Sequence, residues 1–396
     1  MNHSFDEKID RFKTPAAKFH TGYLKDMFGT DDLYPFWVAD QDFKTPPQII
    51  AAFEDKIKEG IFGYEYKPKT FMPALENWYK KRFNVTLNTD WVQFTPTIMS
   101  SMSMALDLFT KTGDGVIIQP PVYMEFENTL KRTGRTKITN PLVLENLHYQ
   151  MNLKELEELA SQENTKALMI CNPHNPGGRV WTKSELQSVV DICAKHHLLI
   201  LADEIHADIV FSNGEFTSLL AFPEIHEQLI VCYSPAKVFN IASVTDSLAI
   251  IPNKEYRAAF SELRIRYNMG RTYAFSRIAM EIGFSQCGEW VDELNHYLEE
   301  NKNYIATYLD ENIPQIKLVQ QEGTYLVWLQ VNQLPLHGNK LIQYLGQEAK
   351  MGLNSGSNFG VSGKNFVRMN IACPLSVIKD AMHHLNKAVA KWDMNK

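Results

Sequence analysis

The feature that most constrains the fold of this chain is a set of three uninterrupted apolar runs, each of which is followed directly by polar residues. The runs occupy residues 167–171, 198–202 and 229–232. A strand that is apolar along its whole length needs helices over both faces of its sheet, as in parallel sheets. The intervals between the runs each accommodate one helix and one strand. The sequence therefore predicts an α/β fold with a mostly parallel sheet.

The first interval carries the signature of a connecting helix. Thr182 and Glu185 stand three residues apart, as in a capping box at a helix start. Leu186, Val189 and Cys193 then follow at helical spacing, so that they share one face. A helix with one apolar face between two apolar strands is the pattern of a βαβ unit.

The polar residues after the three runs lie where the crevice of an open α/β sheet forms. Asn175 follows the first run, Asp203 the second and Lys237 the third. Since ligands bind at the carboxyl ends of such strands, we expect the three side chains to converge. A lysine in a partly dry pocket becomes a nucleophile for a carbonyl group, and a carboxylate there can pair with a protonated ring nitrogen. Taken singly, the same residues also fit a solvated lysine, a helix N-cap and a strand-to-helix turn.

Two further patterns predict sites for anions. Residues 365–371 alternate apolar and polar like a half-buried strand, with Arg368 on the polar side. Its guanidinium offers a bidentate fork for a carboxylate, although a surface arginine fits the same pattern. Residues 95–100 open an amphipathic helix that Gly113 can end, and free N–H groups at a helix start bind anions. Ser234, close to the third run, can hold a phosphate.

Composition and charge exclude several function classes. With 44% hydrophobic and 22% charged residues, the 396 residues can bury a large core and divide into two parts. A net charge of −6 provides no basic field for nucleic acid. Five cysteines are never closely spaced, and the pair His196 and His197 is more typical of solvated residues, so no metal is expected.

No targeting or membrane segment is visible in the sequence. Residues 1–13 lack the apolar core of a signal peptide, and no apolar run is long enough to cross a membrane. The scattered cysteines fit a reducing compartment. We therefore expect a cytoplasmic location and no membrane partner.

Several short stretches are typical of one enzyme family. They are residues 36–43, 62–64, 120–123, 172–178, 203–206 and 234–237. Through them the chain resembles the pyridoxal-phosphate enzymes of the aspartate aminotransferase fold, class I/II. Within that family it is most similar to the cystathionine β-lyase, or cysteine C–S lyase, branch of MalY and PatB type. The resemblance covers essentially the whole chain.

The resemblance implies that pyridoxal 5'-phosphate is the cofactor and assigns roles around its ring. Lys237 would form the Schiff base, and Asp203 would pair with the pyridine nitrogen. Asn175 would bond the ring hydroxyl, and His206 would lie near the same hydroxyl. Tyr123 would stack on the ring.

The resemblance also implies how the two anionic groups are held. Arg368 would bind the substrate carboxylate. The backbone of Ile98 and Met99 would bind the cofactor phosphate, and Ser234 would add a hydroxyl group. Tyr64 would reach the phosphate from the other subunit of a homodimer with shared active sites.

One position departs from the family pattern. Many aminotransferases of this fold carry an arginine eight residues after the Schiff-base lysine, where it clamps the phosphate. Here that position is Thr245. The departure leaves the phosphate with less positive charge from its own chain. The helix start and Tyr64 would therefore contribute more to phosphate binding.

The resemblance implies a specific domain organisation. Residues 45–288 would form a large cofactor-binding domain around the mostly parallel sheet. Residues 1–44 and 289–396 would form a smaller α+β domain from the N-terminal segment and the C-terminal part. Residues 247–251 read as a further strand, which would run antiparallel in this fold.

Three functions compete at this point. We favour a carbon–sulfur β-lyase that cleaves L-cystathionine or another cysteine S-conjugate to a thiol, pyruvate and ammonia. The reasons are the match of residues 37–43 and 203–206 to that branch and the absence of an arginine at Thr245. An aminotransferase is the alternative. A non-enzymatic ligand sensor on this fold is the third, and it would normally need an attached DNA-binding domain.

Overall fold

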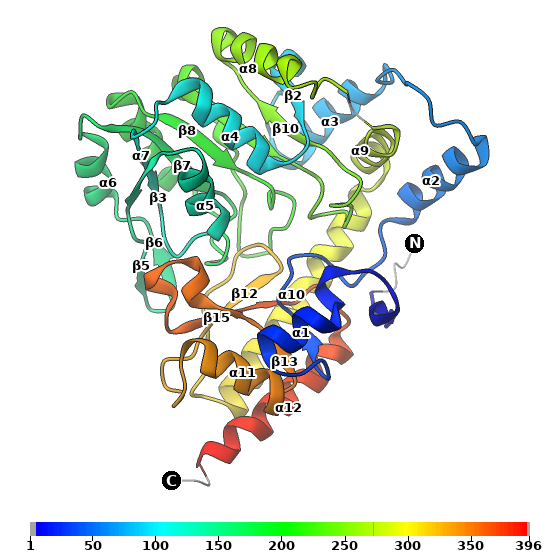
Figure 1. Cartoon of the computed structure of the whole chain (residues 1–396), viewed down its shortest axis with the longest axis vertical. Coiled ribbons are helices and arrows are strands. Elements are labelled where there is room, and N and C mark those ends of the chain that lie inside the picture. Colours follow the sequence, from blue (N-terminus) through cyan, green and yellow to red (C-terminus); the bar gives the residue numbers. More distant parts are fainter. Residues whose placement is uncertain (1–4, 272, 394–396) are drawn as a thin grey trace.

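The computed structural model of the chain describes residues 5–271 and 273–393, and it consists of helices packed around two main sheets (Figure 1). The α-helices are α1 Thr21–Phe28, α2 Pro47–Glu59, α3 Phe71–Phe83, α4 Ile98–Phe109, α5 Met124–Arg132, α6 Leu153–Ala160, α7 Lys183–Lys195, α8 Lys254–Arg266, α9 Ala274–Gln286, α10 Gly288–Asn312, α11 Gly338–Glu348 and α12 Leu375–Asp393. The strands are β1 Tyr34–Pro35, β2 Val92–Thr95, β3 Gly115–Ile118, β4 Thr136–Thr139, β5 Val143–Glu145, β6 His148–Gln150, β7 Thr165–Cys171, β8 Leu199–Asp203, β9 Leu229–Tyr233, β10 Ser247–Ile250, β11 Lys317–Leu318, β12 Leu326–Gln330, β13 Met351–Gly352, β14 Asn354–Ser355 and β15 Phe366–Asn370.

The larger sheet has seven strands in the order β2-β10-β9-β8-β7-β3-β4. The pairs from β9 to β4 are parallel, whereas β10 runs antiparallel to both of its neighbours. The predicted α/β fold and the predicted antiparallel strand after the third apolar run are both confirmed. Because β7, β8 and β9 are parallel neighbours, their carboxyl ends meet at one edge.

The central strands are apolar on both faces because helices cover both faces. Leu168 and Ile170 of β7 pack in the cluster that contains the buried face of α7. Ala167 and Met169, which point the other way, pack in the cluster that contains α4, α5 and α8. This alternation follows from the two-residue period of a strand, and it explains why the run 167–171 contains no polar position.

Helix α7 begins as the sequence predicts. The Thr182 hydroxyl accepts a hydrogen bond from the Glu185 amide, and the Glu185 carboxylate accepts one from the Thr182 amide. Leu186, Val189 and Cys193 are fully buried on the face that covers the sheet. The βαβ unit of β7, α7 and β8 is therefore set by a local cap and one apolar stripe.

Helix α4 ends earlier than predicted. Its last residue is Phe109, and Thr110 caps it with both its amide and its hydroxyl bonded to the Leu106 carbonyl. Gly113 lies in the following turn, with φ of 93°. The prediction that Gly113 ends the helix was wrong, because the threonine hydroxyl satisfies the last turn before the glycine is reached.

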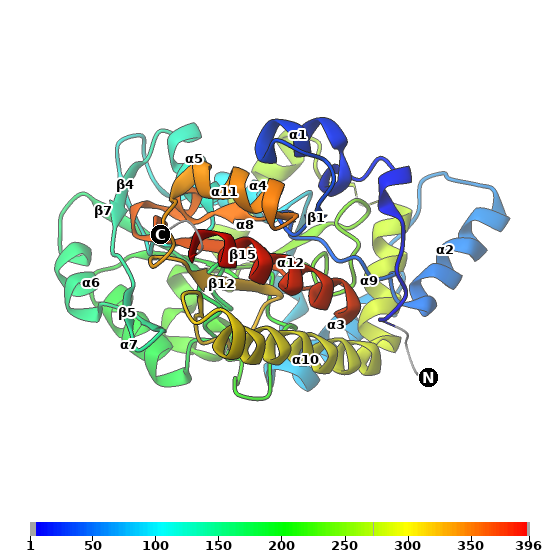
Figure 2. The same ribbon diagram turned by 90° about the horizontal axis from the view of Figure 1, so that it is seen from below.

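The smaller sheet is antiparallel, in the order β11-β12-β15-β14, and long helices α10 and α12 run side by side against it (Figures 1 and 2). Strand β15 was predicted to be half-buried, and this was wrong, since all five of its residues are buried. The polar side of β15 does not face solvent. Arg368 lines a cavity and is only 4% exposed, and the Asn370 side chain donates to the Val38 and Asp40 carbonyls.

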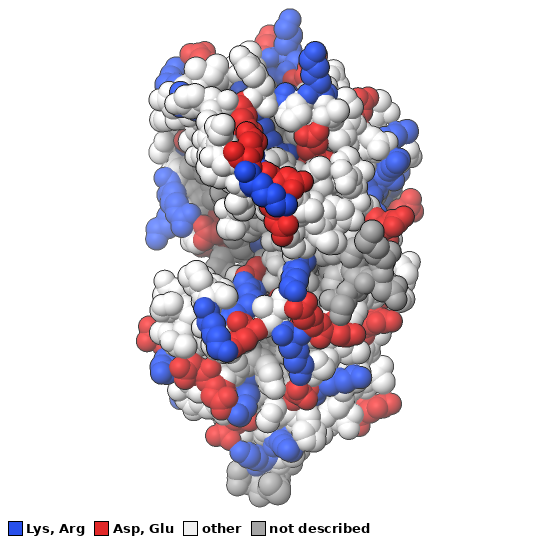
Figure 3. Space-filling view, turned by 90° about the vertical axis from the view of Figure 1, so that its right-hand side faces the viewer, with Lys and Arg blue, Asp and Glu red and all other residues white. Residues whose placement is uncertain are grey.

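The surface combines mixed charge with one projecting apolar element. On the face shown in Figure 3, acidic and basic side chains are interspersed. Helix α2 and the loop after it stand out at one side in both ribbon views (Figures 1 and 2). Within residues 5–271 and 273–393, no helix combines the length and the apolar character needed to cross a membrane.

Candidate active site

A cavity of about 620 Å³ opens at the carboxyl ends of β7, β8 and β9. It is lined by nine of the residues that the sequence singled out, namely Ile98, Met99, Tyr123, Asn175, Asp203, His206, Ser234, Lys237 and Arg368. The volume lies within the range of roughly 300–1,000 Å³ that is usual for cofactor and small-molecule sites. The convergence expected from the strand ends is therefore present in the structure.

Lys237 follows β9, and its side chain ends inside the cavity. Its Nζ donates a hydrogen bond to the Ala39 carbonyl oxygen at 2.7 Å. Burial lowers the pKa of Lys237 to about 8, and the positive charge of Arg368 acts in the same direction. A larger fraction of this amine is therefore neutral near pH 7 than for an exposed lysine, as a nucleophile or a general base requires.

Asp203 ends β8 at the floor of the cavity. Its carboxylate accepts a hydrogen bond from the Ile205 amide at 3.1 Å. Its neighbours in register are Cys171 of β7 and Cys232 of β9, which provide no charge. Burial consequently raises the pKa of Asp203 to about 6. A cation placed against this carboxylate would be strongly favoured, because it would restore the ionised form.

His206 lies three residues after Asp203 and is 2% exposed. Burial lowers its pKa to about 3, so its ring is neutral. The Tyr325 ring meets it edge-on, with the ring centroids 6.0 Å apart. The His206 Nδ1 atom has no hydrogen-bond partner among the described residues, which leaves it available to a bound group.

Among the described residues, Arg368 donates hydrogen bonds only to neutral acceptors. Its guanidinium donates to the Asn175 side-chain oxygen at 3.2 Å and to the Asn354 side-chain oxygen at 2.8 Å. It also donates to the Trp37 carbonyl at 3.0 Å. Its Nε is buried and has no partner among these residues. A buried guanidinium without a carboxylate partner is suited to bind an anionic ligand.

The opposite end of the cavity is built from the start of α4. Thr97 caps this helix by accepting a hydrogen bond from the Ser100 amide. The Ile98 and Met99 amides belong to the first turn, where N–H groups lack intrahelical acceptors and point at an anion site. Thr245 also lines this cavity. Ser234 is buried nearby and donates its hydroxyl hydrogen to the Asp246 carbonyl.

The N-terminal segment 37–43 crosses the cavity and links its two sides. The Ala39 carbonyl accepts hydrogen bonds from both Lys237 and the Tyr325 hydroxyl. The side chain of Gln41 donates to the carbonyls of Lys237 and Val238. The Ala39 carbonyl and the Gln41 side chain therefore fix the lysine and its loop.

Ion pairs hold the same segment from outside. Arg11 binds Asp40 at 2.7 Å and Asp42 at 2.6 Å, and the buried Lys18 binds Asp42 at 2.9 Å. Partly buried pairs are screened less by salt than exposed pairs. Asp40 and Asp42, on either side of Gln41, therefore anchor the segment to Arg11 and Lys18.

Tyr64 is the one predicted site residue that lies outside the cavity of its own chain. It is 88% exposed in the loop between α2 and α3. The Arg271 guanidinium lies 4.8 Å from the centre of its ring and donates to its hydroxyl at 3.3 Å. Its role across a subunit interface remains a prediction.

Three residues of the site were missed by sequence reasoning. Asn354 accepts a hydrogen bond from Arg368, Ala39 accepts one from Lys237, and Tyr325 donates to the same Ala39 carbonyl. No sequence pattern signals Asn354, which lies opposite Arg368 because β14 pairs with β15. Ala39 acts through its backbone, which no residue type reveals.

Comparison with known proteins identifies the family. The family model described as aminotransferase class I and II matches residues 37–385. The chain belongs to this family. It is 32% identical to cystathionine beta-lyase PatB of Bacillus subtilis, over 98% of this chain and 100% of the relative. It is 30% identical to protein MalY of Escherichia coli, over 97% of this chain and 98% of the relative.

A solved structure shows the same fold at similar identity. The crystal structure of cystalysin from Treponema denticola superposes with a TM-score of 0.95 at 32% identity, covering 99% of this chain and 100% of that chain. That crystal structure contains a pyridoxal 5'-phosphate cofactor. The resemblance to the MalY and PatB branch, drawn from the short motifs, is thus confirmed.

Proposed function

We propose that this chain is a pyridoxal-phosphate-dependent carbon–sulfur β-lyase that cleaves L-cystathionine or another cysteine S-conjugate. The observation that carries the proposal is the cavity in which Lys237, Asp203 and Arg368 converge. It occurs in a chain that is 32% identical to a cystathionine β-lyase over nearly its whole length. The products would be a thiol, pyruvate and ammonia.

The cavity fits pyridoxal 5'-phosphate at each of its ends. Asp203 is a buried carboxylate suited to a protonated ring nitrogen, and the start of α4 is suited to a phosphate. The Lys237 amine suits an aldehyde, and Asn175 and His206 can bond the ring hydroxyl. When bound, this cofactor acts as an electron sink for the pair left at the substrate Cα.

Lys237 has two roles in this proposal. Its neutral amine would be the nucleophile that holds the cofactor, and the same amine, when free, would accept the proton from the substrate Cα. The Ala39 carbonyl, 2.7 Å from Nζ, can hold the protonated lysine after that transfer. A pKa of about 8 suits both roles, since the ideal catalytic pKa lies near the operating pH.

Arg368 orients the substrate. Its bidentate fork would bind the substrate carboxylate, while Asn354 and the Trp37 carbonyl hold it in place. Fixing the carboxylate sets which Cα bond faces Lys237. In the elimination, the Cα proton would go to Lys237, the electron pair left on Cα would form the Cα=Cβ bond, and the C–S bond would break with its electron pair on sulfur, which takes up a proton. The remaining unsaturated amino acid is hydrolysed to pyruvate and ammonia.

A homodimer with shared sites is part of the proposal. The loop that carries Tyr64 also exposes Ile61, Phe62 and Tyr66. Contiguous exposed apolar side chains mark an interaction surface.

The five cysteines are free and buried, which fits a reducing compartment, so a cytoplasmic location belongs to the proposal as well.

The decisive experiment supplies L-cystathionine or an S-alkyl cysteine without any keto acid. A lyase should release thiol, pyruvate and ammonia continuously, with thiol and pyruvate in equal amounts, because elimination regenerates the active enzyme. An aminotransferase would stop after one half-reaction. Product limited to the number of active sites, and sustained only after 2-oxoglutarate is added, would make this chain an aminotransferase.

A further inference from the structure

A second, smaller cavity adjoins the main one and has no role in the chemistry described so far. It has a volume of about 240 Å³ and lies between α5, β4 and the 3-10 turns Gly356–Phe359 and Val361–Gly363. Tyr123, Met124 and Asn358 line both cavities. The two cavities therefore share a wall made of these three side chains, and we name the second one the distal cavity.

The distal cavity is suited to part of a molecule rather than to a whole cofactor. Its volume lies below the range of roughly 300–1,000 Å³ that is usual for complete ligands. Ile118, Pro120 and Val122 form an apolar wall on one side. Such a wall suits the methylene groups of a thioether chain.

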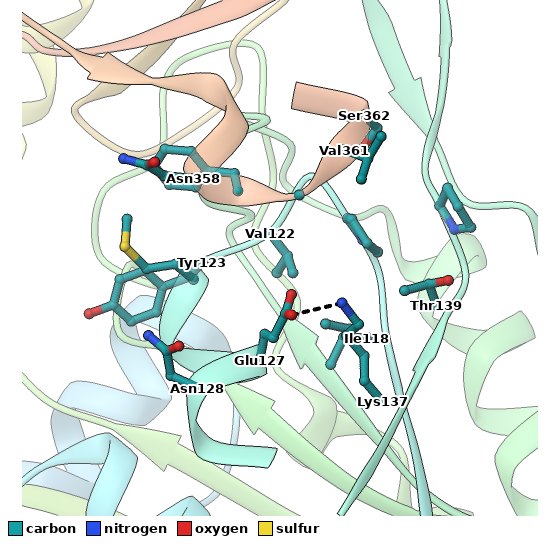
Figure 4. Close-up of a pocket in the computed structure, with 15 residues that line it drawn as sticks. Ile118, Val122, Tyr123, Glu127, Asn128, Lys137, Thr139, Asn358, Val361 and Ser362 are labelled. Carbon is teal, nitrogen blue, oxygen red and sulfur yellow. Dashed lines mark ion pairs between the residues drawn. The ribbon is translucent and has the colours of Figure 1, made fainter. Parts of the chain in front are cut away.

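Charged groups lie at the other side of the distal cavity. Glu127 of α5 and Lys137 of β4 form an ion pair at 2.8 Å, and both line the cavity (Figure 4). Their side chains are 52% and 40% exposed. An ion pair this exposed contributes about 0–1 kcal/mol to stability. Opening it for a ligand therefore costs little.

The chemistry of this pair decides which ligand gains from opening it. A ligand with a single charge would bind one partner and leave the other without its counter-ion. A neutral alkyl group would contact neither partner. A ligand that carries an ammonium and a carboxylate on one carbon can offer the ammonium to Glu127 and the carboxylate to Lys137, so that both charges stay paired.

We propose that the distal cavity binds the end of the sulfur substituent, and that Glu127 and Lys137 select substituents that end in a second α-amino acid group. This inference rests on the proposed lyase function and narrows it. The substrate class becomes thioethers that join two amino acids, in preference to S-alkyl cysteines. Glu127 and Lys137 are then specificity-determining residues, remote from the bond that breaks.

The test uses the holoenzyme and four substrates with the same three-carbon chain on sulfur. L-Cystathionine carries both distal charges, S-(3-carboxypropyl)-L-cysteine only the carboxylate, S-(3-aminopropyl)-L-cysteine only the ammonium, and S-propyl-L-cysteine neither. The measured quantity is kcat/KM for thiol release. We expect the highest value for L-cystathionine, about tenfold or more above S-propyl-L-cysteine.

Two variants assign each charge to its partner. Lys137→Met should remove the advantage of L-cystathionine over S-(3-aminopropyl)-L-cysteine, because it removes the partner of the distal carboxylate. Glu127→Gln should remove the advantage of L-cystathionine over S-(3-carboxypropyl)-L-cysteine. Lys131→Met is the matched control, since Lys131 is an exposed lysine of α5 outside the cavity, and it should leave both ratios as in the wild type.

The outcomes separate this inference from the proposed function. Equal kcat/KM values for all four substrates, or a Lys137→Met variant that changes all four by the same factor, would overturn the inference and leave the lyase intact. No thiol release from any of the four would instead reject the lyase function, and the inference with it.

Discussion

Burial moves the pKa values of Lys237 and Asp203 toward each other, to about 8 and about 6. Both shifts are dominated by desolvation, which disfavours the charged form of each group. Groups with such shifts gather at functional sites, because the same dry cavity that perturbs them also strengthens their interactions with a ligand. The cavity is therefore prepared for a molecule that pairs with Asp203 and reacts with Lys237.

The pKa of Lys237 predicts how cofactor loading depends on pH. Only the neutral amine attacks an aldehyde, so the rate at which apoenzyme turns yellow with pyridoxal phosphate should rise with pH and level off above about pH 8. The rate is measured by stopped-flow absorbance. Lys237→Ala, the control, should develop no such colour and no activity. A rate that still rises up to pH 10 would mean that Lys237 titrates like an exposed lysine.

Asp203 should matter more for turnover than for retention of the cofactor. Asp203→Asn keeps the shape and the hydrogen-bonding capacity of the side chain but removes the charge that holds a ring nitrogen protonated. We expect cofactor to remain bound while kcat falls sharply, measured on the same preparation. Near-normal turnover would show that Asp203 is only structural.

Arg368→Ala should weaken substrate binding and leave the colour of the bound cofactor intact. Removing one partner of a buried, charged pair costs about 2–5 kcal/mol, and about 1.4 kcal/mol corresponds to tenfold in affinity. The measured quantity is the apparent affinity for an S-alkyl cysteine. Arg368→Lys should recover little of the loss, because a lysine lacks the bidentate fork. An unchanged affinity in the alanine variant would remove Arg368 from the site.

At the scale of single elements, the capping box of α7 allows a test that is independent of function. Thr182→Ala removes the hydroxyl that accepts a hydrogen bond from the Glu185 amide. The substitution should lower the free energy of unfolding by about 0.5–2 kcal/mol. The midpoint of urea unfolding measures the change. Ser188→Ala, at a half-buried position within the same helix, is the control and should have a much smaller effect. Equal midpoints for Thr182→Ala and the wild type would mean that the cap contributes nothing.

The elements were predictable where their signals are local. Apolar runs in the sequence indicate strands β7, β8 and β9, and a capping box followed by an apolar stripe indicates α7. The burial of β15 was not predictable, because Arg368 lines a cavity and Asn370 binds the N-terminal segment, and both surroundings exist only in the assembled fold. Alternation along a strand shows that two faces differ, but it does not show whether the polar face meets water or a binding site.

The residues of the candidate site also differ in whether the sequence could predict them. Asn175, Asp203 and Lys237 follow strands, so position alone indicates that they converge. Asn354 binds Arg368 and Ala39 binds Lys237 from distant parts of the chain, and Tyr325 donates to the same Ala39 carbonyl, a group that every residue possesses. Contacts of that kind depend on the final packing and leave no pattern in the sequence.

At the scale of the whole molecule, we propose the division into a large domain of residues 45–288 and a smaller domain of residues 1–44 and 289–396. The strands β2–β10 fall in the first part, and β11–β15 fall in the second. Segment 37–43 joins them at the cavity, since its carbonyls accept from Lys237 on one side and from Arg368 and Asn370 on the other. Any relative motion of the two parts would therefore change the positions of both Lys237 and Arg368 around a bound substrate.

The phosphate end of the cavity leads to a prediction about the assembly. Among the described residues that line the cavity, Lys237 and Arg368 are the only cations, and both are assigned to other groups. Thr245 cannot supply a charge to the phosphate. The exposed Tyr64, with Arg271 against its ring, is suited to complete the site of a second copy of the chain.

A mixing experiment tests whether the sites are shared. Tyr64→Ala and Lys237→Ala should each be nearly inactive as pure proteins. After subunit exchange in an equal mixture, half of the dimers would be mixed, and each would contain one site with both residues intact. About one quarter of the wild-type activity should return, since one of two sites works in half of the dimers. If exchange is confirmed by mass spectrometry of differently tagged chains and the activity stays at the level of the parents, Tyr64 does not serve the partner's site.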